Sequence, residues 1–153
     1  MPYYTRIMKA LICLLIACGP IVLFGKSLDA KNPILGQWIT DRKDLIVEVY
    51  LQGPEYRAKI VWAVDETASP ENRRDEKNPD PQLRDRKIIG MDVLQGLRYN
   101  EKQGCWEDGH IYDATSGKTW SASARLDNSE TLVVRGFWGF EIFGKTLRFK
   151  RYK

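Results

Sequence analysis

The chain has 153 residues, of which 43% are hydrophobic and 11% aromatic, and its formal net charge at pH 7 is +4. This is enough apolar material for one domain with a single core, and it leaves no need for a second domain. The first 25 residues hold two of the positive charges and no negative one, so the remainder carries +2, which gives no electrostatic case for nucleic acid binding.

The N-terminus has the pattern of a secretory signal. Arg6 and Lys9 precede an apolar run from Ala10 to Phe24 that contains no charge. This run is too short for a confident membrane span. We therefore expect residues 1–25 to be a signal peptide, with cleavage near Gly25 or at Ala30, and an exported protein that is periplasmic, envelope-associated or secreted.

Two other interpretations of this segment stay open. Residues 15–19, read as Leu-Ile-Ala-Cys-Gly, resemble the bacterial lipobox, in which Cys18 would be lipidated and become the new N-terminus. The signal and this lipidation are the only membrane attachments that the sequence indicates. Against lipidation, residues 21–24 are more apolar than the usual polar tether of a lipoprotein. The third interpretation is an uncleaved N-terminal anchor.

The mature domain would keep one cysteine, Cys105, because Cys13 and Cys18 both lie in the signal. It therefore has no internal disulfide. The sole histidine, His110, follows Cys105 by five residues with Gly109 between them. We expect this pair to be packing residues of one strand rather than a nucleophile and its base.

Beyond a short tether over residues 26–33, the sequence alternates between apolar and polar residues, and we expect a barrel domain over residues 34–153. Gly36-Gln37-Trp38 opens it. Period-two alternation is typical of half-buried strands, and Gly, Asn and Asp clusters separate the runs as turns. The predicted strands are 45–51, 56–64, 88–94, 96–99, 105–112, 119–126, 131–137 and 147–150, with a bulge at Asp108-Gly109.

The longest break in the alternation spans residues 65–87. Its stretch from Asp75 to Arg86 is dense in charge, and prolines at positions 79 and 81 exclude both a helix and an inner strand. A connection of this length is usually functional or disordered. We expect a rigid flap at one mouth of the barrel, in which Asn78 and Asp80 cap the loop's own backbone and Arg84 or Arg86 pairs with an acid.

Two alternatives for this loop stay open. The first alternative is a lid or recognition surface, with Asn78, Asp80, Arg84 and Arg86 as the recognition residues. The second is a cation site. A cation site would use the oxygens of Asp75, Asn78, Asp80 and Asp85. The prolines take the flexible ligand positions and no glycine permits a sharp turn, so no metal is predicted.

Eight or nine short strands, joined mostly by tight turns and without a convincing amphipathic helix, predict an all-β fold. Between a sandwich and a barrel we favour a single antiparallel up-and-down barrel of about eight strands, because closure removes exposed sheet edges. Eight strands enclose a lumen just large enough for side chains or one small ligand.

Residues 34–153 contain an ordered set of short motifs: Gly36-x-Trp38, Lys59-Ile60-Val61-Trp62, Asn78-Pro79-Asp80, Leu83-Arg84-x-Arg86 followed by Gly90, Trp106-x-x-Gly109-x-Ile111-Tyr112-Asp113, Gly117-Lys118-Thr119, Leu132-x-Val134-Arg135-Gly136-Phe137 and Arg151. This ordered set resembles a bacterial family known as domain of unknown function 2147. The resemblance implies an exported, lipocalin-like (calycin-like) barrel without an established activity. Phe149 departs from the family, which has tryptophan two residues before the final arginine.

The Gly36-x-Trp38 motif also resembles the opening motif of lipocalins. By that resemblance Trp38 plugs the closed end of the barrel and packs under Arg135 or Arg151, a cation–π contact. This is a structural role and does not indicate the ligand.

No set of residues in the mature chain has the pattern of a catalytic site. Glu107 and Asp108 are neighbours on one predicted strand and point to opposite faces, and Ser121 and Ser123 have no histidine nearby in sequence. We therefore predict no catalytic residue and no cofactor, and keep an enzyme on a calycin-like barrel as a third possibility.

The predicted function is non-enzymatic binding of a small apolar or lipid-like ligand, or of an envelope component. Aromatic residues on the predicted strands are the ligand candidates: Trp62, Trp106, Tyr112 and Trp120. The alternative is a protein-interaction or envelope-assembly module that docks an envelope protein through the 65–87 loop.

Overall fold

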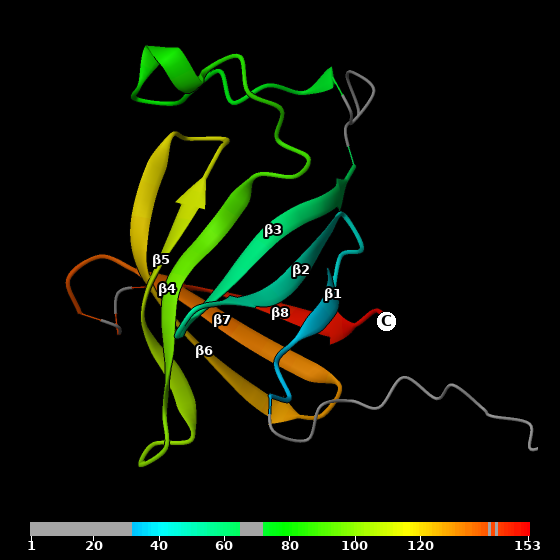
Figure 1. The fold of residues 1–153 in the computed structure, drawn as a ribbon, viewed down its shortest axis with the longest axis vertical. Helices are drawn as coiled ribbons and strands as arrows, with labels where there is room; N and C mark the ends of the chain where they lie inside the picture. Colours follow the sequence, from blue (N-terminus) through cyan, green and yellow to red (C-terminus); the bar gives the residue numbers. More distant parts are fainter. Residues whose placement is uncertain (1–31, 65–71, 141, 143) are drawn as a thin grey trace, which may run out of the picture.

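The computed structural model describes residues 32–64, 72–140, 142 and 144–153. These residues form eight strands: β1 (Gly36–Thr40), β2 (Leu45–Gln52), β3 (Glu55–Ala63), β4 (Asp92–Asn100), β5 (Cys105–Asp113), β6 (Lys118–Asn128), β7 (Thr131–Phe137) and β8 (Gly144–Arg151). Each strand pairs antiparallel with its neighbours in sequence, and β8 returns to β1 to close a barrel (Figure 1). The predicted all-β, up-and-down barrel is confirmed.

The signal peptide predicted over residues 1–25 lies outside the described residues. Within the described part of the chain, no helix has both the length and the apolar character needed to cross a bilayer.

Alternation along the strands builds the core inside the barrel. Val47 and Val49 of β2 pair with Ile60 and Ala58 of β3, and all four side chains are buried. Larger side chains complete the core: Trp38, Leu97, Trp106, Leu132 and Phe149. Trp106 is held between the rings of Tyr56 and Tyr99, with ring centroids 5.9 and 5.0 Å away. This part of the interior is therefore packed with side chains.

The two strands predicted at 88–94 and 96–99 are one strand, β4, preceded by a turn. Gly90 has a φ of +89° in that turn, and its N–H donates to the carbonyl of Ile60 at 2.7 Å. Gly96 has a φ of +76° but stays inside β4. A glycine adopts positive φ at little cost, so the strand continues through Gly96 instead of ending there. The predicted division into two strands at residue 95 was wrong, and residues 88–91 of the first predicted strand lie in the turn before β4.

The bulge predicted at Asp108-Gly109 is confirmed. The β5–β6 register shifts between Trp106 and Gly109, and Asp108 has a φ of +61°. A Cβ at position 109 would overlap the Leu97 side chain, at 2.6 Å from its nearest atom, so the bulge brings the bare Gly109 backbone over Leu97.

An up-and-down barrel gathers its connections at two ends. We call the end with the β1–β2, β3–β4, β5–β6 and β7–β8 connections the open end, and the other end, where the chain enters β1 and leaves β8, the closed end. At the closed end the Trp38 ring is fully buried and the Arg151 guanidinium lies 4.1 Å from its centroid. Arg151 also donates to the carbonyls of Pro33 (2.6 Å) and Leu35 (3.1 Å).

Of the two arginines predicted to cover Trp38, Arg151 is the one in place. Arg135 instead donates to the Thr146 hydroxyl at 2.8 Å and to the Ile142 carbonyl at 3.2 Å. Those partners lie toward the start of β8, whereas Arg151 ends that strand, so Arg135 belongs to the open end.

Candidate functional site at the open end

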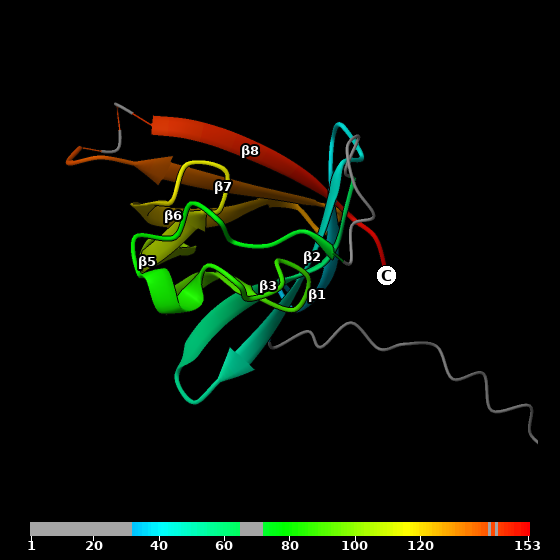
Figure 2. The same ribbon diagram turned by 90° about the horizontal axis from the view of Figure 1, so that it is seen from above.

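Residues 65–71 of the predicted 65–87 loop lie outside the described residues. The segment of residues 72–91, for which we keep the name flap, crosses the open end of the barrel (Figure 2). Its anchor is Asp75, whose side chain is completely buried. The Asp75 carboxylate accepts hydrogen bonds from Tyr112 Oη and Asn78 Nδ2, each at 2.6 Å, and forms an ion pair with Arg86 (Nη2 at 2.8 Å, Nε at 2.9 Å). A carboxylate with this many donors joins both arms of the flap to β5.

The network also sets the protonation states of its members. Burial alone would raise the pKa of Asp75, but the hydrogen bonds from Tyr112, Asn78 and Arg86 outweigh it and hold that pKa below its ordinary value. Burial, and then the hydrogen bond to Asp75, raises the pKa of Tyr112 to about 12. Asp75 is therefore charged and Tyr112 neutral at physiological pH.

Within the flap, side chains satisfy the backbone. Asn78 Oδ1 accepts from the Asp80 N–H and Asp80 Oδ1 from the Gln82 N–H, both at 2.9 Å, where the short 3-10 turn η2 (Pro81–Leu83) begins. Arg84 Nε donates to the Asn78 carbonyl at 2.9 Å. The predicted self-capping is confirmed, and Arg86 is the arginine that pairs with an acid.

The flap rests on the β5–β6 turn at Gly117. This glycine has a φ of +71°, and a Cβ added to it would overlap the Lys77 carbonyl. Only a residue without a side chain permits so close an approach of the flap backbone.

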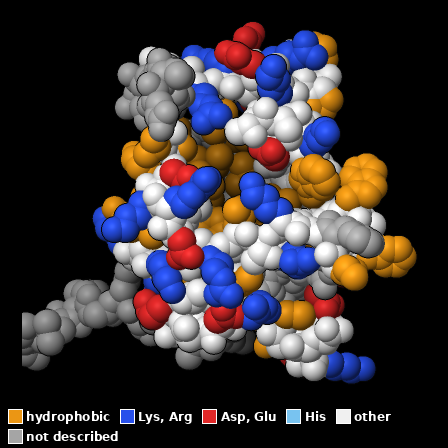
Figure 3. Space-filling model, turned by 180° about the vertical axis from the view of Figure 1, so that it is seen from behind, with side chains coloured by type: hydrophobic (Ala, Val, Ile, Leu, Met, Phe, Trp, Pro, Cys, Tyr) orange, Lys and Arg blue, Asp and Glu red, His pale blue; other side chains and the backbone are white. Residues whose placement is uncertain are grey.

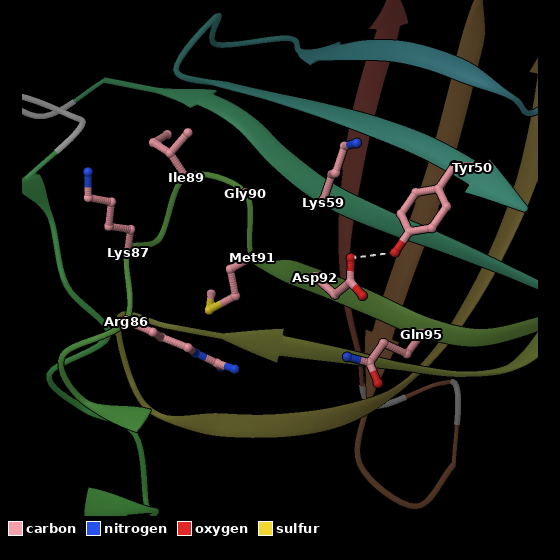
Figure 4. A pocket seen from close by; sticks show the side chains of 9 residues that line it. All are labelled: Tyr50, Lys59, Arg86, Lys87, Ile89, Gly90, Met91, Asp92 and Gln95. Carbon is pink, nitrogen blue, oxygen red and sulfur yellow. Dashed lines mark hydrogen bonds between the residues drawn. The ribbon is translucent and has the colours of Figure 1, made fainter. Parts of the chain in front are cut away.

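Beside the flap lies an open groove of about 660 Å³ (Figure 4). Its polar lining comes from β2, β3, β4 and the flap: Tyr50, Lys59, Arg86, Lys87, Asp92 and Gln95. Ile89 and Met91 supply apolar surface, and both also pack against the core. In Figure 4, Arg86 extends from the flap toward the side formed by Asp92 and Gln95.

Hydrogen bonds and ion pairs fix several of the groove's side chains. Tyr50 Oη donates to Asp92 Oδ1 at 2.7 Å, and burial together with this bond raises the pKa of Tyr50. Lys59 Nζ lies 3.1 Å from the Glu48 carboxylate and 5.4 Å from the Tyr50 ring centroid. Three cationic side chains, Lys59, Arg86 and Lys87, and one acid, Asp92, line the groove. Lys59 is paired with Glu48 and Arg86 with Asp75, and Asp92 is paired with Arg57, which lies outside the lining.

The mouth of the barrel is apolar. Inward-facing side chains near the open ends of four strands are partly exposed: Leu45, Ile111, Trp120 and Leu147. Figure 3 shows a hollow in one face of the molecule, with hydrophobic side chains inside it. The Trp120 ring meets the Trp138 ring edge-on, with centroids 6.0 Å apart.

The predicted site residues fall into three groups. Asn78, Arg86 and Tyr112 meet at Asp75, with Asp80 and Arg84 beside them in the flap. Trp120 lies at the mouth. Trp62 is 39% exposed at the end of β3, and Trp106 is buried in the barrel interior. The structure thus brings the flap residues and Tyr112 together and leaves Trp62 and Trp106 apart from them.

The sequence pattern does not mark Tyr50, Lys59 or Asp92 as site residues, nor Asp75 as the anchor of the flap. Tyr50 and Lys59 alternate with buried residues of β2 and β3, a pattern that marks them only as outward-facing. Among the residues that the structure describes, no group of three His, Cys, Asp or Glu side chains is placed to hold a metal ion.

A closed eight-stranded antiparallel barrel with one end blocked by tryptophan and arginine is a lipocalin-like barrel. Protein HP1028 from Helicobacter pylori, described as belonging to the lipocalin family, has a similar structure, with a TM-score of 0.68 and 23% sequence identity over 78% of this chain and 82% of that one. At this level of identity the likeness shows the fold.

The chain belongs to the bacterial family described as "Uncharacterized protein conserved in bacteria (DUF2147)", whose model matches residues 36–151. The predicted family is confirmed. No curated protein matches the chain significantly.

Proposed function

We propose that this protein is an exported, non-enzymatic barrel that binds a small, lipid-like molecule with an anionic head in the groove beside the flap. The groove is the observation that carries this proposal, since its volume of about 660 Å³ falls in the range of small-molecule sites, roughly 300–1,000 Å³. An anionic head would lie against Lys59, Arg86 and Lys87. The apolar part would lie on Ile89 and Met91.

The flap supports the proposal because it fixes the groove before any ligand arrives. Arg86 is held by a fully buried carboxylate and by the Tyr112 ring, 5.6 Å from the guanidinium carbon. Side chains that are already ordered lose less conformational entropy on binding. A groove with charged walls and an apolar floor favours an amphipathic ligand over a purely apolar one.

Titration with anilinonaphthalene sulfonate, an amphipathic anion, followed by displacement with palmitate or with the neutral hexadecanol, tests this function. We expect displacement by palmitate to be the stronger. The double variant Lys59→Gln/Lys87→Gln should weaken palmitate binding by at least about tenfold, because each charge-assisted contact contributes about 1.5–3 kcal/mol.

Lys102→Gln is the matched control, because Lys102 is an exposed lysine in the β4–β5 turn at the closed end. It should leave the affinity unchanged. Equal palmitate affinities for the double variant and the wild type would contradict binding in the groove.

Export is supported by the basic, then apolar, N-terminal sequence of residues 1–25. We expect the protein in the periplasmic or envelope fraction of its host, with a mature N-terminus after residue 25 or 30, or at an acylated Cys18. Mass measurement of the purified mature chain distinguishes these. A full-length chain recovered from the cytoplasm would contradict export.

A further inference from the structure

The β7–β8 connection carries the most exposed large hydrophobic side chains of the described residues. Trp138, Phe140 and Ile142 have relative exposures of 73%, 75% and 76%. In Figures 1 and 2 the described part of this connection projects beyond the strands at its side of the barrel. In Figure 3 hydrophobic side chains stand out from the corresponding edge of the molecule. We call these three residues the tip.

The tip is held in its projecting position. Arg135 donates to the Ile142 carbonyl at 3.2 Å and to the Thr146 hydroxyl at 2.8 Å, which ties the two strands together at the base of the tip. The Trp138 ring packs edge-on against Trp120. Ile142 is therefore tied to β7 and Trp138 to β6.

The area of the tip is small for a protein interface. Three large side chains offer roughly 500 Å², whereas a stable protein–protein interface takes about 800 Å² from each partner. Binding to a membrane surface does not require an interface of this area. A few aromatic and aliphatic side chains can enter the interfacial zone, where tryptophan in particular is favoured.

The charges around the tip suit an anionic surface. Arg135 and Lys145 flank it on β7 and β8, and Lys118 begins the neighbouring strand β6. Among the described residues, the acid next to Lys145 is Asp113, whose carboxylate accepts hydrogen bonds from Thr115 and Ser116. The sequence of the connection adds one more acid, Glu141, so three cations stand against two acids.

We propose that the tip inserts into the surface of a membrane that contains anionic lipids. Trp138, Phe140 and Ile142 enter the interfacial zone, and Lys118, Arg135 and Lys145 face the lipid headgroups. Because Trp138 contacts Trp120 at the mouth, insertion would bring the apolar mouth of the barrel to the bilayer. The proposal does not depend on which ligand the groove binds.

Flotation with vesicles tests it. The protein is purified from cells in its mature form, so that every variant has the same N-terminus, and is mixed with vesicles of phosphatidylcholine and phosphatidylglycerol. Differences in flotation between variants then report the contribution of the tip. We expect the variant Trp138→Ser/Phe140→Ser/Ile142→Ser to lower the vesicle-bound to free ratio by at least about tenfold. Leu51→Ser, an exposed residue (45%) of β2 near the closed end, should not lower it.

The charge variant Lys118→Glu/Lys145→Glu should weaken binding to the anionic vesicles and leave binding to pure phosphatidylcholine vesicles unchanged. Equal flotation of the tip variant and the wild type would overturn the proposal. So would a wild-type protein that forms dimers through the tip and does not float, since the tip would then join two copies of the chain. Palmitate affinity in vesicle-free solution, which the tip variants should retain, reports the proposed ligand site separately.

Discussion

Replacing Trp38 with alanine is expected to lower the free energy of unfolding by about 3–5 kcal/mol, the range for deletion of a large aromatic ring from a core. Trp38 is fully buried, and its Nε1 donates to the Ile34 carbonyl at 2.8 Å. The variant would leave a cavity at the closed end, an unpaired carbonyl and an Arg151 guanidinium without its ring. Urea denaturation of the mature protein measures the change.

The matched control is Trp62→Ala, because Trp62 is also a strand tryptophan but is 39% exposed. It should cost no more than about 1 kcal/mol. Trp38→Phe keeps an aromatic ring under Arg151 and removes only the indole donor, so an intermediate loss of about 1–2 kcal/mol is expected. If Trp38→Ala and Trp62→Ala were equally destabilising, the closed-end plug would not be a main stabilising element.

The closed end could be predicted from sequence because its features are patterns within short, continuous stretches of the chain. Gly36-x-Trp38 is a short motif, and alternation in 45–51 and 131–137 identifies strands whatever they pair with. The choice between Arg135 and Arg151 could not be made, because it depends on which end of β8 meets β1. That is a property of the closed sheet and its register.

The open end was less predictable because its contacts join distant residues. Tyr112 Oη and the Asp75 carboxylate are 37 residues apart in sequence, and Tyr50 Oη and Asp92 are 42 apart. Only the packing of the flap onto β5 and the register of β2–β4 bring these pairs together. Composition shows that the groups exist but not that they meet.

For the aromatic candidates, the sequence did not predict how deep in the barrel each side chain lies. Trp106 and Trp120 both lie on predicted inward faces, and alternation treats them alike. Trp106 falls in the filled part of the barrel, whereas Trp120 falls at the mouth beside Trp138. Depth follows from strand tilt and from the Asp108-Gly109 bulge, and neither is readable from the period of the pattern.

Asp75→Asn is expected to lower the free energy of unfolding by about 2–3 kcal/mol. The substitution removes the charge from a side chain that is fully buried and leaves Arg86 without its ion-pair partner. Breaking a buried pair costs about 3–5 kcal/mol, but Arg86 is 36% exposed and water compensates it in part. Hydrogen exchange should also accelerate at the amides of Asp75 and Asn78, which bond within the flap.

Asp85→Asn is the matched control, because it removes the same charge from an exposed position of the same flap. Neither the unfolding free energy nor the amide exchange should change with it. Comparable effects of the two variants would mean that net charge, rather than the Asp75 network, holds the flap.

The pH dependence of the Asp75→Asn effect follows from the pKa shifts. The folded-state pKa of Asp75 lies below its ordinary value of 3.8, so its contribution to stability is complete above pH 3.8 and is lost as pH falls through the lowered pKa. The difference in unfolding free energy between wild type and variant should therefore stay constant through neutral pH and shrink in acid. Tyr112 sets the alkaline limit, because its pKa is raised from 10.0 to about 12. Its contribution to stability is complete below pH 10.0 and is lost as pH rises through about 12.

We therefore expect the Asp75 network to hold the flap, and Arg86 in the groove, over the whole pH range between these two limits. A constant difference between wild type and Asp75→Asn down to pH values well below 3.8 would contradict a charged Asp75 in the folded protein. If palmitate affinity falls with Asp75→Asn at neutral pH while Asp85→Asn leaves it unchanged, the anchor of the flap and the ligand groove are coupled through Arg86, the residue that they share.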